Sequence, residues 1–75
     1  MKELVEYIAK SLVNDPSQVE VNEDRRANSV NLTLEVAQED VGRVIGRSGQ
    51  VANAMRTLLR VMASRQGKRV NLEIL

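Results

Sequence analysis

The spacing of the apolar residues changes several times along the 75-residue chain, and this order constrains the fold more than any other feature. Between Lys2 and Val13 the spacing is three or four residues, which predicts an amphipathic helix of about three turns. Tyr7, the one aromatic residue, is expected to be partly packed beside this apolar face. Pro16 ends the pattern, because proline disfavours a helical conformation at the preceding residue. The apolar face consists of Leu4, Val5, Ile8, Leu12 and Val13.

A period of two replaces the helical period after the proline. Val19 and Val21 alternate with polar residues, and a stronger alternation follows the polar stretch of residues 23–29. These two segments predict a hairpin whose linking loop carries Arg25 and Arg26. One face of the sheet is expected to contact the helices and the other to face water. The apolar residues of the second strand are Val30, Leu32, Leu34 and Val36.

The second half of the chain predicts two more helices and a last strand. Acidic residues at 38–40 suit the start of a short helix, where the helix dipole favours negative charge, and Gly46 ends that helix. A longer helix follows Gly49 and closes at Gly67, which suits a left-handed C-terminal cap. Residues 70–74 alternate as a third strand. The expected apolar stripe of the long helix is Val51, Ala54, Met55, Leu58, Leu59 and Met62.

The predicted element order is therefore helix, strand, strand, helix, helix, strand. This order favours an α+β, two-layer fold in which three helices cover one face of a three-stranded sheet. A chain of 75 residues has room for one core, so residues 1–75 are expected to form a single domain. No apolar run approaches the roughly 20 residues that span a bilayer, and we expect a cytoplasmic protein with no membrane contact.

Cysteine and histidine are both absent. Disulfides and thiolate metal sites are excluded, and the commonest acid–base group and metal ligand is missing. No carboxylate is paired with a plausible nucleophile or metal set near the glycines. We therefore expect a protein that is not an enzyme and that carries no metal and no cofactor.

The two signs of charge are segregated along the chain. Residues 41–72 contain no acid but hold seven of the eleven basic residues, whereas nine of the ten acids lie at or before Asp40. This bias favours a polyanionic partner. The alternative, that these are solvated charges on helix surfaces, remains open from the count alone.

Two closely spaced glycines interrupt the helices at Gly46-Arg47-Ser48-Gly49. Without Cβ atoms at the glycines, a sugar–phosphate chain can approach the backbone, and the amides that begin the next helix attract phosphate. A nucleotide-binding P-loop would need lysine and then serine or threonine after the second glycine, and the dinucleotide fingerprint would need a preceding strand. Neither condition is met. A plain helix–turn–helix corner remains as the alternative.

The run from Val44 to Gly49, followed by Val51 and Ala54, resembles the KH-domain signature, and the element order resembles the type II arrangement. Size and order are similar to the small bacterial stand-alone KH proteins of the KhpA family. The resemblance implies that the loop grips the backbone of single-stranded RNA. The implied RNA-binding residues are Arg43, Val44, Ile45, Gly46, Arg47, Ser48, Gly49, Gln50 and Asn53.

The resemblance also implies an apolar groove that holds the bases between a helix and a strand. Each candidate for this groove is better explained as a core residue than as a ligand contact, since its spacing already fits packing. Gln50 and Asn53 stand where related short KH proteins carry basic residues, which predicts modest affinity. Two explanations of these residues stay open, namely hydrogen bonds to bases or sugar hydroxyls, and a merely polar helix surface. The groove candidates are Val41, Val44, Ile45, Val51 and Ala54, with Leu34 or Val36 from a strand.

Other basic residues have alternative explanations. Arg56 and Arg60 could contact phosphate or keep the surface soluble, and Arg65, Lys68 and Arg69 suit the negative end of a helix dipole. A single aromatic residue disfavours binding by base stacking on exposed rings. We expect few phosphate contacts and hence a gentle salt dependence.

The function predicted from these features is that of a non-catalytic single-stranded RNA-binding protein, an RNA chaperone or post-transcriptional regulator. Single-stranded DNA stays open as a ligand. The alternative function is a protein interaction module, with spare apolar surface at Val61 and Ala63. The resemblance implies a homodimer or pairing with a larger KH-containing RNA-binding protein.

Overall fold

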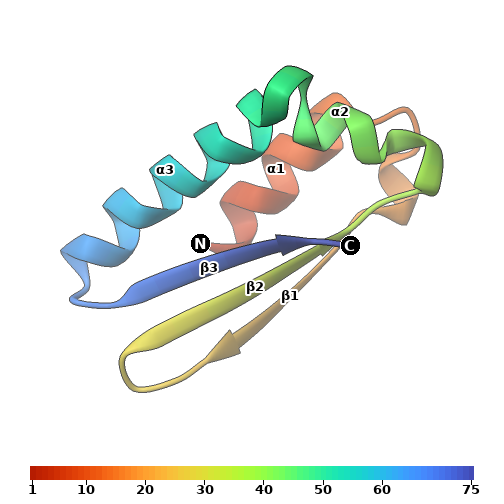
Figure 1. The fold of residues 1–75 in the computed structure, drawn as a ribbon. Coiled ribbons are helices and arrows are strands. Elements are labelled where there is room, and N and C mark those ends of the chain that lie inside the picture. Colours follow the sequence, from red (N-terminus) through yellow and green to blue (C-terminus); the bar gives the residue numbers. More distant parts are fainter.

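A computed structural model describes residues 1–75. Six regular elements follow one another in the predicted order (Figure 1). They are α1 (Lys2–Leu12), β1 (Glu20–Arg25), β2 (Ser29–Glu35), α2 (Val41–Ile45), α3 (Gln50–Arg65) and β3 (Arg69–Ile74). Single 3₁₀ turns occupy Pro16–Gln18, Gln38–Asp40 and Arg47–Gly49. None of the helices has the length and apolar character needed to cross a bilayer.

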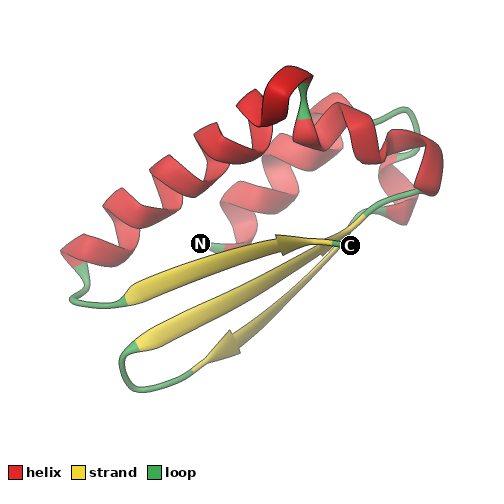
Figure 2. Ribbon diagram, viewed as in Figure 1, coloured by secondary structure: helices red, strands yellow, loops and turns green.

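The sheet has the strand order β1-β2-β3, with β2 in the centre. β1 pairs with β2 in antiparallel fashion and β3 pairs with β2 in parallel, so the sheet is mixed. All three helices lie on one face of the sheet, α1 against β1 and α3 against β3 (Figure 2). The predicted α+β, two-layer fold is confirmed. β1 and β3 are the two edge strands, and β3 is the edge beside α3.

The core lies between the sheet and the helices. Alternate residues of the strands point into it, because side chains along a strand alternate between the two faces of a sheet. The helices form the other side of the core, with Val5 and Ala9 from α1, Val44 from α2, and Met55 and Leu59 from α3. The strand residues of the core are Val21, Val30, Leu32, Leu34 and Leu72, with Val36 just beyond β2.

The buried stripe of α3 differs from the predicted one. The helix buries Ala52, Met55, Leu59 and Ala63, whereas Ala54 and Leu58 are exposed. Small alanines let the helix approach the sheet closely, and the predicted stripe missed this rotation because it included Ala54 and not Ala52 or Ala63. Ala63 is therefore core and offers no spare surface, in contrast to the prediction.

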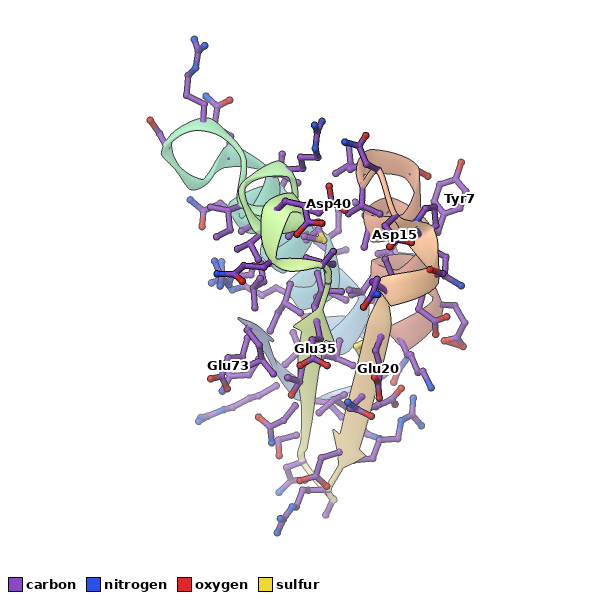
Figure 3. All side chains as sticks on the ribbon, turned by 90° about the vertical axis from the view of Figure 1, so that its right-hand side faces the viewer. Tyr7, Asp15, Glu20, Glu35, Asp40 and Glu73 are labelled. Atoms are coloured by element: carbon purple, nitrogen blue, oxygen red, sulfur yellow. The ribbon has the colours of Figure 1, made fainter.

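Two predictions for α1 are also wrong. Tyr7 is 73% exposed and Leu12 is 39% exposed, because the helix turns only Val5 and Ala9 fully toward the sheet. Figure 3 shows the Tyr7 ring pointing away from the body of the molecule.

The β1–β2 turn is shorter than predicted. Arg25 is the last residue of β1 and pairs in register with Val30, so the linking loop contains Arg26 but not Arg25. Polar residues continue the ladder here because β1 is an edge strand with little of its surface buried. Arg25 forms an ion pair with Glu23, and Arg26 forms one with Asp24.

Candidate nucleic-acid interface

The chain reverses between α2 and α3 through three residues with positive φ. Gly46 has φ 79° and ψ 172°, Ser48 has φ 55° and ψ 26°, and Gly49 has φ 76° and ψ 14°. The Gly49 N–H donates to the Gly46 carbonyl at 3.1 Å and closes the turn. Ser48 is the only residue other than glycine with positive φ. The loop is thus a tight turn that is closed by a hydrogen bond within its own main chain.

Gly46 is required by packing inside the molecule. A Cβ atom at this position would lie 2.6 Å from Val51 Cγ2 and 2.9 Å from the Val51 nitrogen. Its φ and ψ also fall in a region that only glycine occupies readily. The expectation that its missing Cβ leaves room for a ligand is therefore wrong for Gly46, because the first turn of α3 fills that space.

Gly49 has a different environment. The nearest atom to a Cβ at this position would be Asn53 Nδ2 at 3.6 Å, which is an ordinary contact distance. Arg47 and Ser48 beside it are exposed. Gly49 is also the N-cap of the 16-residue helix α3, and no side chain caps this end, while the Gln50 N–H donates to the Arg47 carbonyl. The helix dipole places positive potential here, which favours an anion. The open half of the loop therefore combines bare main chain, the start of α3 and the charge of Arg47.

A buried carboxylate holds α2 in place. Asp40 is fully buried and accepts hydrogen bonds from the backbone N–H groups of Asn14 and Asp15, at 3.1 and 3.2 Å. Arg43 Nε lies 3.2 Å from Asp40 Oδ1, with about half of the Arg43 side chain exposed. Figure 3 shows Asp40 facing the segment that carries Asp15. The sequence interpretation placed Asp40 at a helix start but missed its role as the link to the chain after α1.

A groove borders the open half of the loop. A cavity of about 580 Å³ is lined on the helical side by Ile45, Gly49, Ala52 and Arg56. On the other side it is lined by residues 71–74 of the edge strand β3 and by residues 31–33 of the central strand β2. The edge strand beside the loop is thus β3, and the predicted groove residues Leu34 and Val36 are buried in the core instead.

Most of the other apolar groove candidates are also placed elsewhere. Val44 is completely buried, so this predicted RNA-binding residue is a core residue with no surface for a ligand. Val41 and Val51 pack partly against the same core, and Ala54 is exposed but does not line the groove. Ile45, which is 37% exposed, is the one apolar candidate that lines it.

Arg56 joins α3 to β3 across this groove. Its Nε and Nη2 atoms donate to the Leu72 carbonyl at 3.3 and 3.2 Å, and its Nη1 donates to Asn53 Oδ1 at 3.4 Å. The prediction considered only phosphate contact or solubility for Arg56. The structure adds a third role, because the guanidinium satisfies a carbonyl of an edge strand. Asn53 in turn orients Arg56, while Gln50 is exposed at the first turn of α3.

The outer face of the sheet carries negative charge. Glu20 and Glu35 are directly opposite in the β1–β2 ladder, and Glu73 is the register partner of Thr33 beside them. Figure 3 shows these three carboxylates along one level of the sheet. A polyanion is repelled from this face, so the charge segregation seen in the sequence becomes a difference between two faces of the molecule.

Comparisons with known proteins show what this chain is similar to. The family model described as "KhpA/KhpB, KH domain" matches residues 2–74. A protein of Clostridium perfringens named RNA-binding protein KhpA is 49% identical over 75 residues, which cover all of both chains. A protein of Borreliella burgdorferi with the same name is 48% identical over 73 residues, covering 97% of this chain and 89% of that one.

A solved structure supports the fold independently. The chain superposes with a TM-score of 0.54 on the crystal structure of Era in complex with MgGDPNP and nucleotides 1506–1542 of 16S ribosomal RNA. The match covers 97% of this chain but only 28% of the Era chain, at 20% sequence identity. At this identity the likeness shows a shared fold and nothing further.

Proposed function

The chain belongs to the KhpA/KhpB KH-domain family, and on that basis we propose that it binds single-stranded RNA through the loop Gly46–Gly49 without catalysing a reaction. The observation that carries this proposal is the open half of the loop. The start of α3, the bare backbone at Gly49 and the exposed Arg47 lie next to a groove of about 580 Å³. The relatives' name, RNA-binding protein KhpA, supports the same ligand.

In the proposed binding mode, the loop holds the RNA backbone and the groove holds the bases. Phosphates contact Arg47 and the amides at the start of α3, where the helix dipole adds positive potential. Bases enter the groove, where Ile45 offers apolar contact and Arg56 offers guanidinium donors. Glu73 at the groove repels phosphate, which directs the backbone toward the loop side. Gln50 and Asn53, both exposed, are proposed to hydrogen-bond sugars or bases.

The cellular role that fits this mode is an RNA chaperone or post-transcriptional regulator. Few phosphate contacts and a shallow groove give modest affinity and little sequence preference. Single-stranded DNA is the natural competitor to test, because a contact to the ribose 2′-hydroxyl would separate the two ligands. A cytoplasmic location remains a prediction.

A double substitution in the loop tests the proposal. R47D/S48D should abolish crosslinking to single-stranded RNA while leaving the circular dichroism spectrum unchanged. Aspartate is among the few side chains that tolerate the left-handed conformation of Ser48, so the fold should survive.

The matched control is K10D/S11D, which makes the same change in charge. Both residues are exposed on α1, which packs against β1 at the opposite edge of the sheet from the groove. This control should retain crosslinking. If R47D/S48D binds RNA as well as the wild type, the loop is not the site.

An exposed apolar stripe on α3 favours a second function, self-association. Leu58 and Val61 are 49% and 50% exposed, and Ala54 continues the line one turn earlier. At about 100° per residue these side chains lie on the side of α3 away from Arg56 and Arg60. We propose that a second copy of the chain covers this stripe, since a small core leaves little stability to spare and the groove stays free. The same stripe could pair with a larger KH-containing protein.

The oligomeric state tests this second function. Sedimentation velocity should show a concentration-dependent dimer for the wild type and a monomer for V61D. N53D is the control, because Asn53 is exposed on the same helix and lies on the side of Arg56, to which it is hydrogen-bonded. A wild-type chain that remains monomeric at millimolar concentration would remove the proposal.

A further inference from the structure

Asp40 is the only polar or charged residue among the buried ones, and its carboxylate does not serve its own helix. It is the N-cap residue of α2, where an aspartate usually accepts a hydrogen bond from the first amides of the helix. No such bond is formed. Oδ1 instead accepts from the Asn14 N–H and Oδ2 from the Asp15 N–H. Asp40 therefore joins α2 to a segment that lies 26 and 25 residues earlier in the chain.

The segment that receives the carboxylate is itself held on both sides. Before it, Val13 belongs to the core, and the Val13 N–H donates to the Ala9 carbonyl at 3.1 Å. After it, the Ser17 hydroxyl donates to Asp15 Oδ1 at 2.5 Å, and the Gln18 N–H donates to the Asp15 carbonyl at 3.2 Å. The two amides that bind the carboxylate are thus part of a fixed turn.

The helix α2 depends on such a link for its position. It has five residues, well below the roughly 12–15 that an isolated helix needs in water. Val44 is its only completely buried apolar residue. At its far end Ile45 lines the groove, and Gly46 begins the loop directly. A shift of α2 at its Asp40 end would therefore move both the groove wall and the loop.

We propose that Asp40 is a positioning residue for RNA binding. Its link to Asn14 and Asp15 fixes α2, and α2 in turn holds the loop and Ile45 in the arrangement that binds the strand. This inference rests on the proposed function but concerns a residue with no exposed surface, which the ligand does not touch. Coupling between two sites is reciprocal, so bound RNA must also stabilise the link.

The first test is the RNA affinity of D40N. The substitution keeps the shape of the side chain, but an amide nitrogen then faces a backbone donor. Fluorescence anisotropy with an oligouridylate of about ten nucleotides should show binding weakened about fivefold to tenfold, under conditions where urea unfolding shows the variant to be folded. General electrostatics predicts the opposite sign, because the loss of a negative charge favours a polyanion. The direction of the change therefore separates positioning from charge.

Two variants are matched controls for D40N. E39Q makes the same change in charge at the neighbouring position, where Glu39 is exposed and forms no ion pair. It should bind the oligouridylate at least as tightly as the wild type. V30A lowers stability by opening the core at the start of β2, which Figure 1 shows at the opposite end of the molecule from α2. When folded, it should keep the wild-type affinity.

The second test uses the wild-type chain and measures amide hydrogen exchange by NMR. The Asn14 and Asp15 amides should exchange about tenfold more slowly when free oligouridylate is at about ten times its dissociation constant, because an opening that breaks the link also excludes RNA. The Arg26 N–H, which donates to the Ser29 carbonyl at 2.8 Å in the β1–β2 turn, is the internal reference and should be unchanged. A purely structural role of Asp40 would leave all three rates unchanged.

Several outcomes would overturn the inference. They are a D40N protein that binds at least as tightly as the wild type, equal weakening by V30A, and exchange at Asn14 and Asp15 that ignores RNA or slows no more than at Arg26. The exchange measurement needs no variant, so it decides the question even if D40N does not fold. In each case R47D/S48D would still abolish binding, and the proposed function would stand. If R47D/S48D binds the oligouridylate like the wild type, the proposed function itself fails.

Discussion

Gly46 and Gly49 lie three residues apart in one turn, but their surroundings differ. The Gly46 side faces inward, against Val51, and belongs to the segment that the buried Asp40 anchors. The Gly49 side has only Asn53 near it, and the start of α3, which no side chain caps, lies beyond. The two glycines look equivalent in sequence, but Gly46 serves packing inside the molecule and Gly49 belongs to the proposed binding surface. Substitutions at the two halves should separate stability from RNA affinity.

The largest expected effect is on stability at the inward half. G46A should lower the free energy of unfolding by about 3–5 kcal/mol, because it combines a backbone conformation reserved for glycine with a clash against Val51. Urea unfolding followed by circular dichroism measures this. The double variant G46A/V51A should recover part of the loss, since it removes the nearest atom at 2.6 Å but not the backbone strain. A G46A protein as stable as wild type would contradict the packing role.

The next largest effect on stability is expected at Asp40, which anchors the segment that leads to Gly46. D40N keeps the shape of the side chain but loses the charge that holds two backbone N–H groups and Arg43. We expect a loss of about 2–3 kcal/mol in the free energy of unfolding, because hydrogen bonds to a charged group are stronger than neutral ones.

A partner substitution separates the two parts of this anchor. R43Q removes only a half-exposed partner and should cost about 1 kcal/mol or less in the same urea experiment. If D40N costs no more than R43Q, the amide contacts of Asp40 contribute little.

Substitutions of Gly49 should lower stability only slightly but weaken RNA binding strongly. G49A should cost about 1 kcal/mol in unfolding free energy, from the left-handed conformation alone, and G49N should cost less because asparagine tolerates that conformation. Both should weaken RNA binding, since a side chain now stands on the bare main chain. Anisotropy with a short RNA checks this. A G49N protein that binds like wild type would show that the ligand does not touch this side.

The smallest expected effect concerns the bridge across the groove. R56K removes the paired donation to the Leu72 carbonyl but keeps the charge, and should cost about 1 kcal/mol in stability. If the bridge also shapes the groove, RNA affinity should fall more than for R65K, which alters an arginine outside the lining. Equal affinities of the two variants would confine Arg56 to a stabilising role.

The sequence predicted the element order, the α+β class and the loop because these depend on local patterns. The change from helical to alternating spacing, the stop at Pro16 and the left-handed Gly67 are each properties of a few neighbouring residues, and all are found in the structure. Periodicity also placed the strand residues Val30, Leu32 and Leu34 in the core. Periodicity predicted the buried face of α3 less well, since Ala52 and Ala63 face the sheet and Leu58 does not.

The features that only the tertiary structure decided join residues far apart in the chain. Asp40 meets the backbone at Asn14, 26 residues away, and Arg56 meets the Leu72 carbonyl, 16 residues away. The choice of β3 as the strand beside the loop follows from its parallel pairing at the sheet edge. Local propensity carries no information about such partners, because their positions arise only when the whole chain buries its apolar faces together.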